Sequence, residues 1–150
     1  MDLIEGRSDP EALMVRVQLY NRMGRLELEA DNVSRSIALF AQALDLAESA
    51  HDRYQAAGLM GNLGGAYARQ QDSARAIYFT ERALRTSEEL GDQIGVARQS
   101  FNLALLRLSV GHLDNARKLL KSAYEASCRA GWHEGLDMTR AAITKLGEAL

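Results

Sequence analysis

The chain has 150 residues, of which 47% are hydrophobic and 25% charged, and its formal net charge is −2 at pH 7. This length allows one well-buried core but is short for two domains, and the composition is that of a globular rather than a disordered chain. The small net charge gives no long-range attraction to nucleic acid or to an anionic membrane, and the single cysteine excludes an internal disulfide framework.

The first eight residues are kept apart from the predicted fold. Residues 4–7 read Ile-Glu-Gly-Arg, the recognition sequence of the clotting protease factor Xa, so residues 1–8 are either a natural leader or the remnant of a cleavable fusion linker. No segment has the roughly 20 apolar residues of a membrane-spanning helix or the pattern of a secretory signal. We therefore expect a cytoplasmic protein with one domain over residues 9–150.

Residues typical of helix ends recur along the chain at regular spacing. Asp9-Pro10 favours a helix start, because Asp caps the N-terminus and Pro is tolerated at the first helical position. Further N-cap residues follow at Asn32, Asp52, Asp72 and Asp92. Gly91 and Gly131 suit the left-handed conformation that closes a helix, and His51 stands at the equivalent place.

These boundaries predict seven helices and no strand, because apolar residues follow each other at steps of three and four rather than two. Short connections make consecutive helices antiparallel. The predicted helices are 10–30, 33–50, 53–70, 73–90, 93–110, 113–130 and 133–149.

The chain repeats itself with a period of forty residues. Asn62-Leu63 recurs as Asn102-Leu103, and Gly64 is equivalent to Gly24 and Ala104. A fixed period of this size indicates stacked helical units. Small residues at equivalent places allow the two helices of each unit to approach closely.

The repeated positions resemble the tetratricopeptide repeat, whose consensus has Leu-Gly, then Tyr and later alanines at fixed places. The second repeat carries that pattern at Leu63, Gly64, Tyr67, Ala76 and Ala83. The consensus unit has about 34 residues. The longer period here, with Leu90-Gly91-Asp92 between repeats, is similar to the variant in the Pins/LGN group of G-protein regulators and in some bacterial regulators. Departures from the consensus occur at Glu27, Thr80 and Arg107.

The resemblance implies an all-α fold, an α-solenoid with right-handed superhelical twist. It divides the chain into repeats at about 9–51, 52–91 and 92–131 and a closing helix at 132–150. It also implies that the first helix of each repeat lines a concave groove, where a partner lies as an extended or helical peptide.

The forty-residue period predicts which side chains share that groove. Four sets of equivalent residues face it: Gln18, Gly58, Arg98 and Met138; Asn21, Gly61, Phe101 and Ala141; Arg22, Asn62, Asn102 and Ala142; and Arg25, Gly65, Leu105 and Lys145. Together with Arg69, this lining is locally basic on a slightly acidic protein, which favours an acidic peptide. The alternative is that these polar residues merely solvate an exposed face.

The proposed peptide contacts combine amides with arginines. Asn62 and Asn102 can each bind a peptide backbone, and Arg98, one turn before Asn102, suits a carboxylate. In co-chaperones of this family a two-carboxylate clamp uses the same columns, but here Asn21 and Arg25 are among the replacements, so that specific partner is not implied. The predicted peptide-binding residues are Arg22, Arg25, Asn62, Gly65, Arg69, Arg98, Phe101, Asn102 and Leu105.

Besides the repeat residue Gly64, the predicted helix 53–70 contains three further glycines, which is unusual. Each costs roughly 0.5–1 kcal/mol relative to alanine in a helix. Gly58, Gly61 and Gly65 therefore predict a bare groove floor, with Phe101 and Leu105 as an apolar wall. The alternative explanation is that these glycines allow tight helix packing, or that they arose by tolerated sequence drift.

No catalytic, metal or cofactor site emerges from the sequence. His51, His112 and His133 stand at predicted helix boundaries, and Cys128 lacks an identifiable base. Trp132 suits a packing role at the last helix junction. A metal or cofactor bound to the purified protein would be needed to support an enzyme.

The sequence thus favours a non-enzymatic module that binds an acidic or extended peptide of a protein partner, without nucleic acid or membrane. The alternative is a structural segment of a longer solenoid, or a homo-oligomer that associates through the array ends. The C-terminal end offers an apolar face of Ile143, Leu146 and Leu150 for such contacts.

Overall fold

The computed structural model describes residues 9–147, so the predictions for residues 4–7 and for Leu150 lie outside the described residues. Seven α-helices make up this part of the chain, and six of them begin and end within one residue of the predicted bounds. They are α2 (Pro10–Glu29), α3 (Val33–Ser49), α4 (Arg53–Arg69), α5 (Ser73–Leu90), α6 (Gln93–Ser109), α7 (Leu113–Ala130) and α8 (His133–Lys145).

The prediction for the C-terminal end of α8 was wrong. The helix ends at Lys145 rather than at residue 149. Gly147 has a φ of +74°, a left-handed conformation in which the helix does not continue. The forty-residue period places the end of this helix at residue 149, equivalent to the end of α6 at Ser109, but α8 stops four residues earlier.

The predicted N-caps are confirmed where the residue is aspartate. Side-chain oxygens of Asp9, Asp52, Asp72 and Asp92 accept hydrogen bonds from backbone N–H groups three residues later, at 2.9–3.1 Å. Asn32 stands at the N-cap of α3 but makes no capping bond. Its amide instead donates to the Glu27 carboxylate at 2.8 Å.

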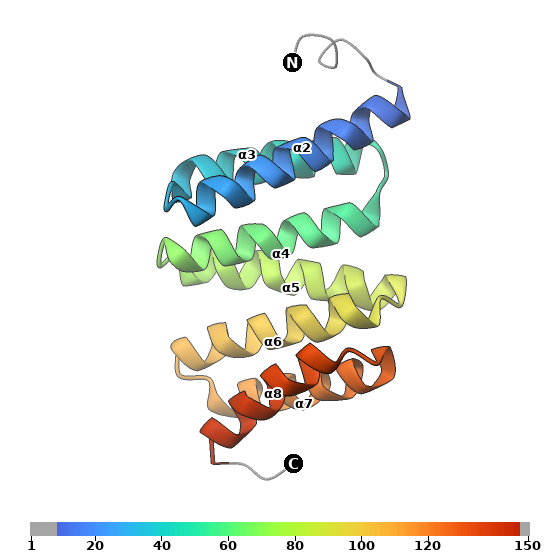
Figure 1. The fold of residues 1–150 in the computed structure, drawn as a ribbon. Coiled ribbons are helices and arrows are strands. Elements are labelled where there is room, and N and C mark those ends of the chain that lie inside the picture. Colours follow the sequence, from blue (N-terminus) through green and yellow to red (C-terminus); the bar gives the residue numbers. More distant parts are fainter. Residues whose placement is uncertain (1–8, 148–150) are drawn as a thin grey trace.

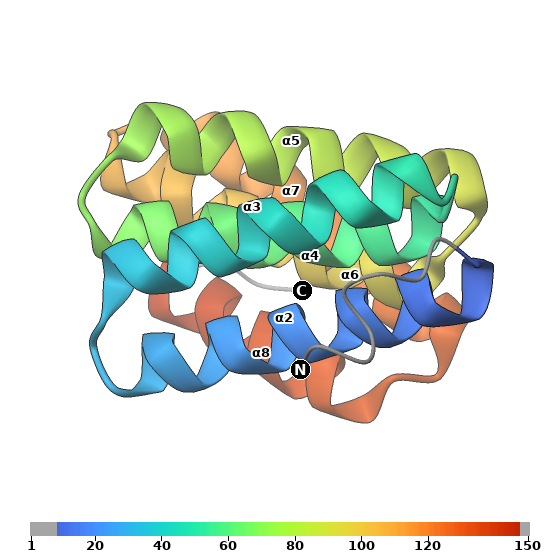
Figure 2. The ribbon, with the colours of Figure 1, turned by 90° about the horizontal axis from the view of Figure 1, so that it is seen from above.

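The helices form three antiparallel hairpins, α2–α3, α4–α5 and α6–α7, which stack in chain order and are followed by α8 (Figure 1). Figure 2 shows α3, α5 and α7 together on one side of the stack. On the other side α2 and α8 project outwards, and α4 and α6 are recessed behind them. This arrangement confirms the predicted all-α solenoid of antiparallel hairpins.

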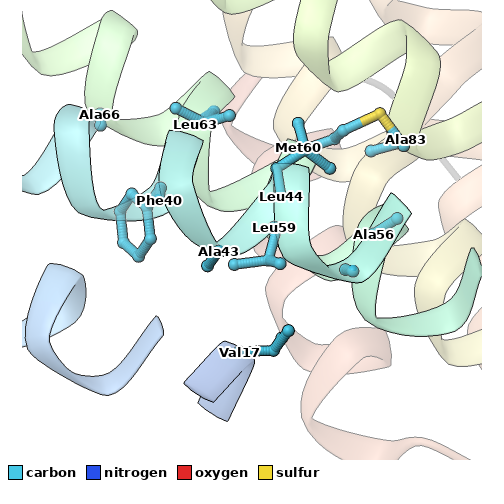
Figure 3. Packing of buried hydrophobic residues seen from close by; sticks show 11 residues of the cluster. Val17, Phe40, Ala43, Leu44, Ala56, Leu59, Met60, Leu63, Ala66 and Ala83 are labelled. Atoms are coloured by element: carbon cyan, nitrogen blue, oxygen red, sulfur yellow. The ribbon is translucent and has the colours of Figure 1, made fainter. Parts of the chain in front are cut away.

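Close approach within each hairpin depends on the small residues that revealed the repeat. Phe40 of α3 is fully buried against Gly24, where a Cβ would lie 2.7 Å from the ring. Phe40 belongs to a buried cluster that joins α2, α3, α4 and α5 (Figure 3). At Gly64 a Cβ would lie 2.2 Å from the Thr80 hydroxyl oxygen, so this position also requires glycine unless the helices separate.

The three departures from the consensus make polar contacts in place of apolar packing. The buried Thr80 hydroxyl donates to the Ala76 carbonyl at 2.8 Å. The carboxylate of Glu27, in the last turn of α2, lies 3.2 Å from the guanidinium of Arg35, in the first turn of α3. Arg107 pairs with Glu81 of α5. The fold therefore tolerates these substitutions.

The expected apolar face at the C-terminal end is wrong for its described residues. Ile143 is only 7% exposed and is clustered with Ala104 and Leu120, and Leu146 packs against the same cluster. The reason is that α8 takes the place of the first helix of a further repeat and turns its apolar side towards α6 and α7.

The opposite side of α8 is polar. Asp137, Arg140 and Thr144 are all exposed, whereas their equivalents in the second repeat are buried. The Tyr124 hydroxyl accepts a hydrogen bond from Arg140 and raises the pKa of its guanidinium above the ordinary value. The described C-terminal end thus presents polar groups to solvent.

Candidate functional site

One face of α4 carries three of the nine predicted binding residues, namely Asn62, Gly65 and Arg69. Tyr54, Gly58, Asn62, Gly65 and Arg69 follow one another at steps of three or four, so they project from the same side of the helix. We call this side, together with the equivalent sides of α2, α6 and α8, the groove face. The buried residues of α4 occupy the remaining sides, which face α3 and α5.

A cavity of about 270 Å³ lies at the centre of the groove face, between α2, α4 and α6. Five predicted site residues line it, and they are Arg25, Asn62, Gly65, Arg69 and Asn102. A second cavity of about 410 Å³ lies along α2. Arg22 and Arg25 both line that second cavity, so Arg25 stands between the two.

The structure does not bring the other predicted residues into these cavities. Arg98 and Phe101 line a separate space of about 10 Å³, no larger than one water molecule needs. The guanidinium of Arg98 lies 5.8 Å from the centre of the Trp132 ring, in a cation–π contact. Leu105 is 46% exposed and lines none of the three cavities.

Asn62 and Asn102 are equivalent in sequence but differ in their surroundings. The Asn62 amide donates to the Asn21 side chain at 2.9 Å, which links α4 to α2. The residue equivalent to Asn21 in the next repeat is Gly61, which has no side chain to pair with Asn102. Within residues 9–147, Asn102 makes no side-chain hydrogen bond, and its amide is free at the wall of the central cavity.

The arginines of the groove face also differ in what holds them. Arg69 donates to the Leu28 carbonyl at 2.5 Å, near the C-terminal end of α2, where a positive charge is favourable. Neither Arg22 nor Arg25 forms an ion pair or hydrogen bond with another described residue, and both are exposed. With Glu29 as the acidic residue in the lining, the cavities carry a net positive charge.

The three glycines of α4 that the sequence assigns to the groove floor, Gly58, Gly61 and Gly65, have two different roles. A Cβ on Gly58 or Gly65 would meet nothing within 4 Å, so these two positions are open and bare. A Cβ on Gly61 would lie 2.3 Å from the Gln99 side chain, which is 4% exposed. Gly61 is therefore a packing residue and does not belong to the bare floor.

The described residues hold no group of three or more His, Cys, Asp or Glu side chains that could bind a metal. Cys128 is an exposed free thiol. Among the helices from α2 to α8, none combines the length and hydropathy needed to cross a membrane.

The sequence interpretation missed an apolar part of the groove face. Met14, Tyr54 and Ile94 are 51%, 64% and 42% exposed and are equivalent residues of α2, α4 and α6. They lie one helical turn before Gln18, Gly58 and Arg98. Applying the forty-residue period to one more turn would have found them.

Comparison with known proteins gives one family and several similar structures. A family model described as "Tetratricopeptide repeat" matches residues 15–89, which is half of the chain. The crystal structure of the TPR domain of Arabidopsis FLU is 20% identical, with a TM-score of 0.71 over 75% of this chain and 95% of that one. No curated protein matches the sequence.

Two longer proteins also share the fold. Aspartyl phosphate phosphatase F from Bacillus subtilis is 19% identical, with a TM-score of 0.82 over 91% of this chain and 35% of that one. BtubC (BKLC) from P. vanneervenii is 21% identical, with a TM-score of 0.76 over 95% of this chain and 60% of that one. At these identities the likeness concerns the fold.

Proposed function

Because the chain belongs to the tetratricopeptide repeat family, whose domains generally bind proteins, we propose that it is a non-catalytic interaction module. Its ligand is an acidic peptide segment of a protein partner, bound on the groove face between α2, α4 and α6. The observation that carries this proposal is the unpaired Asn102 amide, which faces the same cavity as Arg25.

Asn102 supplies the neutral part of the recognition. Its amide has donors and an acceptor and can bind a carboxylate, hydroxyl or amide side chain of the ligand, as well as a free backbone N–H or C=O. A typical hydrogen bond of this kind contributes about 1 kcal/mol net. Because the equivalent Asn62 is already paired with Asn21, the two positions can be compared directly within one protein.

Arg22 and Arg25 supply the charge. Their exposed guanidinium groups are free to pair with carboxylates, each pair contributing about 0.2–1 kcal/mol in solvent. A larger contribution is expected where a ligand covers the pair and excludes water. A face that only served solubility would not require two bare glycines, each of which costs roughly 0.5–1 kcal/mol in a helix.

We place this module in the cytoplasm, where a reducing environment suits the exposed thiol of Cys128. Self-association is the second candidate, and one observation favours the N-terminal end for it. Leu26 is 58% exposed on α2, whereas its equivalent Ala66 is fully buried under the preceding hairpin. Light scattering over a dilution series tests this candidate, since a monomer at every concentration would exclude it.

The groove proposal is tested by selecting binders from a random peptide library and titrating them against Arg25→Glu. We expect the selected peptides to be acidic and to lose roughly tenfold in affinity, because reversal removes one ion pair and adds a repulsion. Lys118→Glu on α7 is the matched control, since it makes the same charge change at an exposed position away from the groove face. Equal effects of both variants, or none of Arg25→Glu, would overturn the proposal.

A further inference from the structure

An apolar stripe runs across the groove face beside the basic cavities. It consists of Met14, Tyr54 and Ile94, which are 51%, 64% and 42% exposed on three successive first helices. These helices lie side by side in the array (Figure 1). Single exposed apolar residues are ordinary, but an aligned group on neighbouring helices indicates an interaction surface.

The fold itself does not require apolar residues at these positions. The equivalent residue of α8 is Glu134, which is exposed in the same way. The stripe therefore follows α2, α4 and α6, the three helices that also line the central cavity.

The groove face thus has two chemically different sides. Along α4, Tyr54 and Asn62 are two turns apart, a separation of about 12 Å at 1.5 Å per residue. The apolar stripe lies at the N-terminal side. Arg22, Arg25 and Arg69 lie at the C-terminal side, where the exposed Leu26 and Leu105 are interspersed with them. Gly58 lies between the two sides, and the space above its Cα is open.

A helix fits the width and length of this surface. An α-helix with its side chains is about 10–12 Å wide, which matches the separation of the two sides. Packed helices lie about 8–10 Å apart, so the stripe from α2 to α6 extends over about 16–20 Å. A ligand helix of about 11–13 residues covers that distance at 1.5 Å per residue.

An extended peptide suits the floor less well. If the side chains of an extended peptide contacted the apolar stripe on one side and the arginines on the other, its backbone N–H and C=O groups would point towards α4. The backbone of α4 at Gly58 lies inside the helix, where N–H and C=O groups bond to each other. A ligand helix likewise satisfies its own backbone groups, and the absent side chain of Gly58 allows it to approach closely.

We infer that the ligand is an amphipathic α-helix, with apolar residues on the stripe of Met14, Tyr54 and Ile94 and acidic residues against Arg22 and Arg25. This inference rests on the proposed function, because it names the kind of peptide that occupies the same groove face. The charge pattern also fixes the orientation of the ligand face, since its acidic side must lie over the C-terminal halves of α2 and α4.

The test selects binders from a library of random peptides of about 20 residues, long enough for a helix of about 30 Å. The inference expects apolar residues at steps of three and four with Asp or Glu on the adjacent face, and a gain of helical circular dichroism on binding. Tyr54→Ser and Ile94→Ser should each weaken binding at least fivefold. Tyr78→Ser on α5, also an exposed tyrosine, is the matched control and should leave affinity unchanged.

The outcomes separate this inference from the function on which it rests. Peptides whose binding depends on Arg25 but which lack the apolar spacing, or gain no helix signal, would leave the groove assignment standing and refute the helical ligand. Peptides indifferent to both Arg25→Glu and Asn102→Ala would refute the proposed function together with this inference. Equal losses for Tyr54→Ser and Tyr78→Ser would also refute the apolar stripe as a contact surface.

Discussion

Two neighbouring residues, Gly64 and Gly65, show how much the surroundings of a glycine decide its role. A Cβ on Gly64 would lie 2.2 Å from the Thr80 hydroxyl and 3.1 Å from the Ala76 carbonyl, whereas a Cβ on Gly65 would meet nothing within 4 Å. Both residues are glycine in one helix, but only Gly64 is needed for helix packing. Gly65 has no packing role and faces the groove.

We therefore expect opposite effects of alanine at these two positions. Gly64→Ala should lower the free energy of unfolding by about 1–3 kcal/mol, because overpacking forces α4 and α5 apart. Gly65→Ala should raise it by roughly 0.5–1 kcal/mol, because alanine loses less backbone entropy in a helix. Urea unfolding of the two variants measures both effects, and changes of the same sign would contradict the assignment.

The role of Gly64 could be predicted from the sequence because Gly24 occupies the equivalent place. The distinction between Gly58, Gly61 and Gly65 could not. It depends on Gln99, a residue of α6 whose side chain covers Gly61 and leaves the other two bare. A forty-residue pattern identifies equivalent positions but does not show which side chain from a neighbouring helix covers each one.

At the scale of the helices, capping residues and turn residues that can be recognised in the sequence mark most helix ends. Aspartates cap four helices, and His51, Gly91 and Gly131 have φ values of +56°, +68° and +63° as expected. For this reason most helix bounds could be predicted to within one residue. Only α8 ended more than one residue earlier than expected, because it stops four residues before the position equivalent to the end of α6.

The caps provide a second prediction. Asp52→Ala and Asp92→Ala should each lower the free energy of unfolding by about 1 kcal/mol, because each variant leaves a backbone N–H without its partner. Asn32→Ala should cost less, since Asn32 caps nothing and its bond to Glu27 is exposed. Thermal or urea unfolding distinguishes these cases, and an equal cost at Asn32 would contradict the observed capping pattern.

Left-handed residues in the turns provide a third prediction. Gln71 and His51 have φ values of +62° and +56°, a region that is unfavourable for any residue with a Cβ. Gln71→Gly and His51→Gly should each raise the free energy of unfolding by up to about 1 kcal/mol. Gly91→Ala, at φ +68°, is the matched reverse change and should lower it by a similar amount. Destabilisation by Gln71→Gly would show that its side chain contributes more than its backbone strain costs.

At the scale of the whole molecule, the repeat predicts the scaffold better than the site. The forty-residue period shows which residues share the groove face, but not which of them are already engaged with other residues. Asn62 is paired with Asn21, Arg98 packs on Trp132 and Arg69 donates to α2. These contacts join different repeats. They therefore depend on residues that differ between equivalent positions, and not on the residues that recur every forty positions.

The two-sided groove predicts a particular dependence on salt. Raising the ionic strength from about 0.1 M to 1 M shortens the Debye length from about 10 Å to 3 Å, which should weaken the contacts of Arg22 and Arg25. Apolar contacts at Tyr54 are not screened, so binding should fall but not vanish. Titrations at several salt concentrations measure this, and complete loss or complete independence of salt would contradict a surface that combines both kinds of contact.

The most direct test of the groove compares the two equivalent asparagines in a single titration with a selected acidic peptide. Asn102→Ala should weaken binding roughly fivefold, the equivalent of one lost hydrogen bond of about 1 kcal/mol, while leaving the free energy of unfolding almost unchanged. Asn62→Ala should mainly reduce that free energy, because its amide is bonded to Asn21 at 2.9 Å. Unchanged affinity in Asn102→Ala, or a greater loss in Asn62→Ala, would contradict the assignment of the central cavity as the binding site.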